Sequence, residues 1–248
     1  PECLWSSCTL YRHTCHDSFY RAEINSWPGI GRGYAYSVYR DNFISGAQAN
    51  IATTYPTQLC GQPTANATAF GAAWVGITVD PGRGAGPVDI WAQLGYIKRR
   101  SLMEVPTTTI RVNIFTETMA GPDYDRTFFP PPFLSSHVYD CLLINWSNGH
   151  IQFHVDGLLT DQTAFAGWRQ PQYANRADFM GETLNIFDRM PGTNGSRCTF
   201  TNCMYAVGIG GQFQAVEFLP KDAKSNVPLF FGSVWLSPTS IQIWDRRP

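Results

Sequence analysis

The feature that most constrains this fold is a long succession of short segments in which apolar and polar residues alternate. Side chains of a β-strand point to its two faces in turn, so a strand with one buried face has a period of two residues. No segment shows a strong helical period over three turns, which predicts an all-β chain. The alternating segments are 33–39, 72–79, 90–97, 109–116, 140–146, 150–155, 183–187, 204–209, 214–218, 229–236 and 241–244.

Turn-forming residues separate these segments. The clearest hairpin is predicted around Asn148-Gly149, because strands stand before and after a short Asn-Gly turn. Many strands at short spacing indicate an antiparallel two-sheet β-sandwich or jelly roll. Other turn signals are Asp80-Pro81-Gly82, Asp156-Gly157, Pro191-Gly192 and Ser237-Pro238.

Three stretches depart from the strand pattern. Residues 1–30 form a predicted cysteine-rich arm, and residues 31–248 form the predicted sandwich domain. Residues 173–182 are expected to form a brief helix. Residues 120–136, with their proline run, are expected to form a rigid loop.

Composition excludes several kinds of partner. Only 15% of the 248 residues are charged, the net charge is −1, and lysine and arginine form no long run, so nucleic-acid binding has little electrostatic support. No apolar run reaches the length of about 18 residues that a membrane span needs. Aromatic residues make up 14% of the chain, which suits strands and flat binding surfaces.

Cysteines and glycosylation sequons both favour an oxidising compartment. The chain has seven cysteines, and the odd number leaves at least one thiol without an intramolecular partner. Asn66, Asn145 and Asn194 each begin an Asn-x-Ser/Thr sequon. The N-terminal Pro1 is typical of a processed chain, so we expect a secreted glycoprotein. The expected disulfides join Cys198 with Cys203 and at least one pair among Cys3, Cys8 and Cys15.

Four short motifs follow one another along the chain: Trp74-Val75-Gly76-Ile77, Ala92-Gln93-Leu94-Gly95-Tyr96, Phe115-Thr116-Glu117 and Phe231-Gly232-Ser233-Val234-Trp235. In this order they resemble motifs of the glutamic peptidases (eqolisins). Trp74-Val75-Gly76-Ile77 is similar to that family's Trp-Val-Gly-Ile strand, and Ala92-Gln93-Leu94-Gly95-Tyr96 stands where the family carries its catalytic glutamine. Phe115-Thr116-Glu117 is similar to the next strand, and the segment 177–187 stands where the family carries its catalytic glutamate. Phe231-Gly232-Ser233-Val234-Trp235 resembles the closing strand.

The resemblance implies a concanavalin A-like sandwich and a catalytic pair, Gln93 and Glu182. A glutamate can accept a proton from water and later donate it to the leaving amine. A glutamine amide can orient the water and donate a hydrogen bond to the developing oxyanion. The implied activity is an acid endopeptidase that cuts polypeptides at about pH 3–5 and needs no cofactor.

Other residues offer competing chemistry. Two of the carboxylates Glu117, Asp156 and Glu182 could form a glycosidase pair, although Asp156 is more simply a turn residue. Trp91 shares strand parity with Gln93 and is a candidate binding residue beside Glu117. Trp74 is a further binding candidate, for which core packing is the simpler account.

Histidines give weaker signals. His13, Cys15 and His16 could bind a metal with nearby cysteines, but the spacing fits no standard zinc pattern, and disulfides account better for the cysteines. His150 and His154 are expected on one outward strand face. No metal is therefore expected. The sequence leaves two functions open: a secreted acid peptidase, or a non-catalytic extracellular protein that binds glycans or self-associates.

Overall fold

Antiparallel β-strands make up the fold. The structure is a computed structural model, and it describes residues 32–55, 69–79, 90–100, 110–120, 123–145, 149–164, 174–183, 188–208, 212–216 and 229–247. Among these residues no helix is long and apolar enough to cross a membrane. The strands are β1 (Arg32–Ala52), β2 (Ala69–Val79), β3 (Ile90–Arg100), β4 (Ile110–Ala120), β5 (Asp123–Phe129), β6 (Ser136–Asn145), β7 (His150–Val155), β8 (Leu158–Ala164), β9 (Ala174–Thr183), β10 (Cys198–Val207), β11 (Gln214–Ala215), β12 (Phe231–Ser237) and β13 (Ser240–Asp245).

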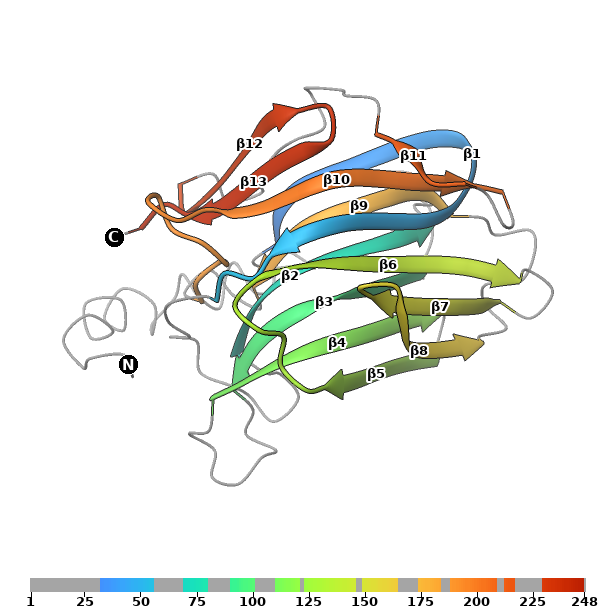
Figure 1. Ribbon diagram of the computed structural model, residues 1–248, viewed down its shortest axis with the longest axis horizontal. Helices are drawn as coiled ribbons and strands as arrows, with labels where there is room; N and C mark the ends of the chain where they lie inside the picture. The colour runs from blue at the N-terminus through green and yellow to red at the C-terminus, as the bar shows by residue number, and fades with distance from the viewer. Residues whose placement is uncertain are drawn as a thin grey trace, which may run out of the picture.

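The strands form two layers that share the long strand β1 (Figure 1). Its first half pairs with β9, which continues through β2, β3 and β4 to β5, and we call this layer the first sheet. Its second half pairs with β10 on one side and β6 on the other, which extends the second sheet to β12 and to β8. This arrangement confirms the predicted antiparallel two-sheet sandwich.

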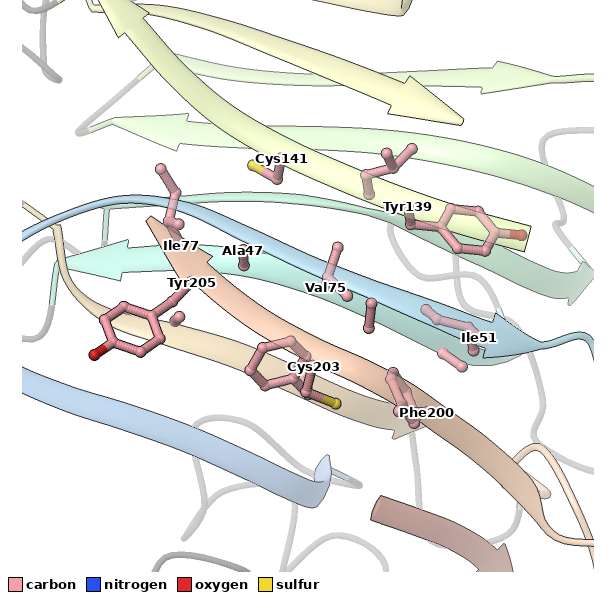
Figure 2. Packing of buried hydrophobic residues seen from close by; sticks show 14 of the residues in the cluster. Ala47, Ile51, Val75, Ile77, Tyr139, Cys141, Phe200, Cys203 and Tyr205 are labelled. Atoms are coloured by element: carbon pink, nitrogen blue, oxygen red, sulfur yellow. The ribbon is translucent and has the colours of Figure 1, made fainter. Parts of the chain in front are cut away.

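Apolar side chains from both layers fill the space between the sheets (Figure 2). Strand β6 crosses over β2 and β3, so that Tyr139 and Cys141 face the same interior as Val75 and Ile77. These positions recur every second residue, as expected for strands with one buried face. Fully buried aromatic and aliphatic side chains dominate this core, including Tyr96, Phe153, Phe179, Phe200 and Ile51.

One irregularity keeps the core face of β10 continuous. The register between β1 and β10 shifts between Gln48 and Asn50, and Asn202 of β10 has a positive φ of 52°. An extra residue at a β-bulge changes which side of the strand the following residues face. Phe200 before the bulge and Cys203 and Tyr205 after it therefore all lie in the core.

Two predictions about irregular segments are wrong. Residues 173–182 were expected to be helical, but β9 is a central strand between β1 and β2. Neighbouring strands decide this conformation, because a segment that fills a gap in a sheet gains a full ladder of hydrogen bonds. Residues 123–129 of the predicted 120–136 loop form the edge strand β5, and the proline run follows it.

The predicted turns are found where the structure describes them. β6 and β7 form the expected hairpin before and after Gly149, whose φ is 66°. Asp156 and Gly157 connect β7 to β8 with φ values of 52° and 76°, a left-handed pair typical of tight hairpin turns. Asp156 also accepts hydrogen bonds from the Val138 amide and the His137 ring, so its carboxylate fixes the turn against β6.

The predicted Cys198–Cys203 disulfide is absent. Both residues are free and buried on β10. Extended backbone carries their Cα atoms about 16 Å apart, well beyond the roughly 7 Å that a disulfide tolerates. Burial raises the pKa of the Cys198 thiol to about 12, so it is a packed and unreactive group. Cys3, Cys8, Cys15, His13 and His16 lie outside the described residues, as does the predicted arm 1–30.

Candidate functional site

A row of polar residues crosses the outer face of the first sheet, on the side away from the main core. Adjacent strands place Asp178 of β9, Gly76 of β2, Gln93 of β3, Glu117 of β4 and Arg126 of β5 directly opposite one another. We call these residues the site row. Because their side chains share one face, the sheet brings together residues up to 102 positions apart, from Gly76 to Asp178.

The site row is polar, yet its members from Asp178 to Glu117 are buried, and Arg126 at its end is half-buried. Gln93 and Glu117 are each 6% exposed, and Asp178 is 0% exposed. Charged side chains are rarely buried to this extent unless partners compensate them. The residues that carry charge in this row therefore need their hydrogen-bond partners.

Glu117 is the most heavily bonded member of the site row. Its Oε2 atom accepts hydrogen bonds from Arg126 Nη2 at 2.7 Å, Arg126 Nε at 2.9 Å and Gln93 Nε2 at 3.1 Å. Two bonds from one guanidinium to a carboxylate fix both partners geometrically. Glu117 in turn orients the Gln93 amide, because it draws the nitrogen and not the oxygen of that amide toward itself.

Opposing effects set the pKa of Glu117. Burial raises the pKa of Glu117, Arg126 opposes that rise, and the negative charge of Glu182 adds to it, with a raised pKa as the net result. Burial alone would lower the pKa of Arg126, but Glu117 outweighs it and the Arg126 pKa is raised. The negative charge of Glu182 raises the pKa of Glu117 and that of Arg126, so Glu182 interacts electrostatically with both residues.

Asp178 and Gln93 face each other across a position without a side chain. Gly76 pairs with Asp178 on one side and with Gln93 on the other. Strands lie about 4.8 Å apart, so the Cα atoms of Asp178 and Gln93 are separated by about 10 Å. No side chain at position 76 separates these two polar groups. Thr78 Oγ1 donates a 2.7 Å hydrogen bond to Asp178 Oδ2 and orients this carboxylate.

Two glycines also make room for Trp74. A Cβ atom at Gly76 would lie 3.2 Å from Cζ3 of Trp74, and one at Gly95 would lie 2.6 Å from the Trp74 Cα and Cβ atoms. The indole is 6% exposed and donates a 3.0 Å hydrogen bond from Nε1 to Glu182 Oε2. Trp74 packs in a small second cluster of Phe70, Ala72, Ile97, Phe115 and Met180. This agrees with the core packing expected for Trp74.

Glu182 shares the outer face but occupies a different row. It pairs with Ala72, whereas Asp178 pairs with Gly76, which puts Glu182 about 13 Å further along β9 from Asp178. The register thus aligns Asp178 and not Glu182 with Gln93. The sequence analysis did not name Asp178, because the resemblance selected Glu182 from the segment 177–187 and the segment 173–182 was also expected to be helical. The alternation of Ala177, Asp178 and Phe179 is the signal that could have found it.

A more exposed row borders the site row. Thr78, Trp91, Met119 and Tyr124 lie opposite one another on β2 to β5. Trp91 is half-buried and Tyr124 is 51% exposed, so this border is more accessible than the site row itself. Burial and the nearby Glu117 raise the pKa of Tyr124 well above its usual range. Trp91 therefore stands beside Gln93, as its parity predicted.

The remaining predicted residues lie elsewhere. Asn194 is exposed in the segment before β10, whereas Asn66 lies outside the described residues, as does the side chain of Asn145. His150 and His154 are half-buried on the outward face of β7, one before and one after the core residues Ile151 and Phe153. In the part of the chain that the structure describes, no group of three or more His, Cys, Asp or Glu side chains is arranged to hold a metal.

Comparison with known proteins finds similar solved structures but no matching family. No family model matches the chain, and no curated protein matches it significantly. Among solved structures, the chain is similar to scytalido-glutamic peptidase with a transition state analog inhibitor. The two share 13% identity and a TM-score of 0.48 over 87% of this chain and 98% of that one.

Two further solved structures, of a porphyranase and a carrageenase, are also similar. Porphyranase B from Zobellia galactanivorans shares 9% identity and a TM-score of 0.34 over 62% of this chain and 63% of that one. The κ-carrageenase from Pseudoalteromonas carrageenovora, solved with an oligotetrasaccharide of κ-carrageenan, shares 8% identity and a TM-score of 0.28 over 87% and 65%. These identities assign neither a family nor an activity to this chain.

Proposed function

We propose that this chain is an acid hydrolase that cuts polypeptides at the site row, where Gln93 and a carboxylate activate a water molecule. The observation that carries the proposal is the alignment of buried Gln93 and buried Asp178 on either side of Gly76. Polar side chains buried away from the main core are costly, and such groups are concentrated at functional sites. The order of motifs that resembles the glutamic peptidases gives independent support from the sequence.

Gln93 orients the reacting groups. One N–H of its amide is held by Glu117, and Glu117 is itself held by Arg126. An amide has a second N–H and an oxygen acceptor. The free N–H can donate to the oxyanion that develops on the substrate carbonyl, and the oxygen can accept a hydrogen bond from the attacking water.

Asp178 is the carboxylate that we assign to proton transfer. It removes a proton from the water as the hydroxide attacks the carbonyl carbon, and a tetrahedral intermediate forms. It then gives that proton to the leaving nitrogen as the carbon–nitrogen bond breaks. Thr78 keeps Asp178 oriented through the hydrogen bond to Oδ2. Glu182 is the alternative that the family resemblance implies, with its carboxylate held by Trp74.

The test is cleavage of a denatured protein substrate between about pH 3 and pH 8 by the wild-type chain and four variants. We expect cutting at about pH 3–5 and little near neutrality, because one carboxylate must serve as base and as acid. Asp178→Asn should remove the activity, and Gln93→Ala should lower turnover on the order of 10²-fold through the loss of an oxyanion donor. Asp125→Asn, an exposed carboxylate on β5, is the matched control and should have no effect.

Glu182→Gln separates the two carboxylates. If Asp178 is the base, this variant should keep most of its turnover. Loss of activity in Glu182→Gln with retention in Asp178→Asn would transfer the role to Glu182. No cleavage by the wild-type chain at any pH, with the fold intact, would contradict the hydrolase.

We further propose that the protein is extracellular and glycosylated. Asn194 supports this proposal, because its sequon lies in an exposed segment. The site row would then be exposed to the pH of the extracellular medium.

A further inference from the structure

A second polar cluster lies on the outer face of the second sheet, in the layer opposite the site row. Its centre is Trp244 of β13, which pairs with Gly232 of β12. A Cβ atom at Gly232 would collide with the Trp244 Cε2 and Cζ2 atoms, so the indole lies flat against the glycine backbone. Ile243 beside it points into the main core, which confirms that Trp244 faces outward.

Two exposed arginines flank this indole. The Arg197 guanidinium carbon lies 3.9 Å from the ring centroid, and that of Arg246 lies 5.8 Å from it. Within the described residues, the ion pairs at this end join Arg189 and Arg247 to Asp245 and include neither Arg197 nor Arg246. The two outer guanidinium groups therefore present positive charge that no carboxylate of the described chain neutralises.

The Trp244 ring nitrogen gives a second, independent observation. Trp244 is 7% exposed, and its buried Nε1 atom has no hydrogen-bond acceptor among the residues that the structure describes. A buried donor without an acceptor is costly, and such groups are rare in native proteins. An oxyanion that reached the edge of the indole would satisfy this donor and both guanidinium groups together.

The backbone around these side chains is already fixed. The Arg246 amide donates to Phe230 O at 2.7 Å, and the Arg246 carbonyl accepts from Asn194 Nδ2 at 3.1 Å. Arg197 forms a β-bridge with Gly192. A ligand would therefore order side chains only, which lowers the entropic cost of binding.

Polar side chains continue the surface next to the indole. Arg197 Nη1 donates to Gln242 Oε1 at 3.4 Å, and Gln242 Nε2 donates to Thr199 Oγ1 at 3.2 Å. Amide and hydroxyl groups of this kind can exchange these bonds for bonds to sugar hydroxyls. Two guanidinium groups without a carboxylate partner among the described residues match isolated anionic groups better than the dense phosphates of a nucleic acid. The net charge of −1 also disfavours binding of a polyphosphate chain.

We propose that Arg197, Arg246 and Trp244 form a binding site for the carboxylate or sulfate groups of an acidic polysaccharide. The guanidinium groups bind the oxyanion, the indole N–H donates to it, and Gln242 and Thr199 contact neighbouring sugar hydroxyls. The site is independent of the hydrolase, because it lies on the other layer of the sandwich.

The test is affinity electrophoresis of the full chain in gels that contain polygalacturonate, dextran sulfate or neutral dextran. We expect retardation by one or both acidic polymers and none by dextran, and the two acidic arms distinguish carboxylate from sulfate. The double variant Arg197→Gln/Arg246→Gln should raise the dissociation constant at least about tenfold, since each charge-assisted bond is worth about that factor. Trp244→Phe keeps the ring without the N–H and should weaken binding several-fold.

Arg111→Gln, an exposed arginine on β4, is the matched control and should bind like the wild type. Circular dichroism of each variant shows whether the fold is kept. Equal retardation of wild type and the folded double variant would overturn the proposal, as would no retardation by either acidic polymer. Stronger retardation by single-stranded DNA than by both polysaccharides would also overturn it and assign the site to nucleic acid.

Discussion

The central strands of the first sheet, β9, β2 and β3, carry different kinds of side chain on their two faces. On the inner face, Val75, Leu94 and Phe179 are fully buried in the main core. On the outer face, their immediate neighbours Gly76, Gln93 and Asp178 form the centre of the site row. Burial alone therefore does not distinguish the two faces, because Gln93 and Asp178 are also nearly inaccessible.

The two faces differ in the chemistry of their buried side chains. Apolar burial on the inner face stabilises the fold by roughly 25 cal/mol for each Å² removed from water. The outer face buries an amide and carboxylates, which contribute little net stability and cost much when a partner is lost. Neighbouring residues in one strand would thus serve stability on one face and the proposed activity on the other, and substitutions at adjacent positions can test that separation.

The largest contrast is expected between Leu94→Ala and Gln93→Ala. Leu94→Ala leaves a cavity in the main core and should lower the free energy of unfolding by about 2–5 kcal/mol, with little change in turnover per folded molecule. Gln93→Ala should do the reverse and lower turnover on the order of 10²-fold. Urea unfolding and peptidase assays on both variants measure the contrast. If either variant changed the free energy of unfolding and the turnover to the same degree, the contrast between the two faces would be contradicted.

A smaller effect on the free energy of unfolding is expected from substitution of Gly76, which is a member of the site row and pairs with β3. A Cβ atom there would lie 2.5 Å from the backbone oxygen of Ala92 and 3.1 Å from Gln93 Cβ. Gly76→Ala should therefore push β2 from β3 and lower the free energy of unfolding by about 1–3 kcal/mol.

The control for this prediction is Gly195→Ala. A Cβ atom at Gly195 meets no atom within 4 Å, so that variant should change the free energy of unfolding by less than about 1 kcal/mol. Thermal denaturation of both variants measures the difference. Two equally stable variants would mean that β2 and β3 adjust freely around the site row.

The smallest effect concerns the pH dependence of stability at Glu117. Its pKa is raised in the folded chain, so the stability that it contributes is complete below its ordinary pKa of 4.5 and is lost as pH rises through the raised value. Glu117→Gln cannot ionise. Its free energy of unfolding, relative to that of the wild type, should therefore increase as pH rises from about 4 to 8.

Chemical denaturation at several pH values measures this trend, with Asp125→Asn as the exposed control. A relative stability that stays constant, or that falls as pH rises, would show that Arg126 compensates fully for the burial of Glu117. The outer face would then resemble an ordinary structural ion pair.

Alternation in the sequence determined the sandwich and most of its strands, because a period of two residues follows directly from strand geometry. The same reasoning put Gln93 and Trp91 on one face, since they stand two residues apart in one strand. Glu117 was named only as a candidate residue, and the pairing of β3 with β4 placed it opposite Gln93. Turn residues also carried their own information, because Asp156-Gly157 and Gly149 adopt left-handed φ values that few other residues tolerate.

Only the tertiary structure decided which residues meet across strands. Register is a relation between segments far apart in the chain, and a shift of two residues preserves every pattern visible in the sequence. For this reason the sequence could name Glu182 as the partner of Gln93, whereas the pairing of β9 with β2 aligns Asp178 with it. The same limit explains why the predicted Cys198–Cys203 disulfide is wrong. The two residues are close in sequence, but the extended backbone of β10 separates them too far for a disulfide.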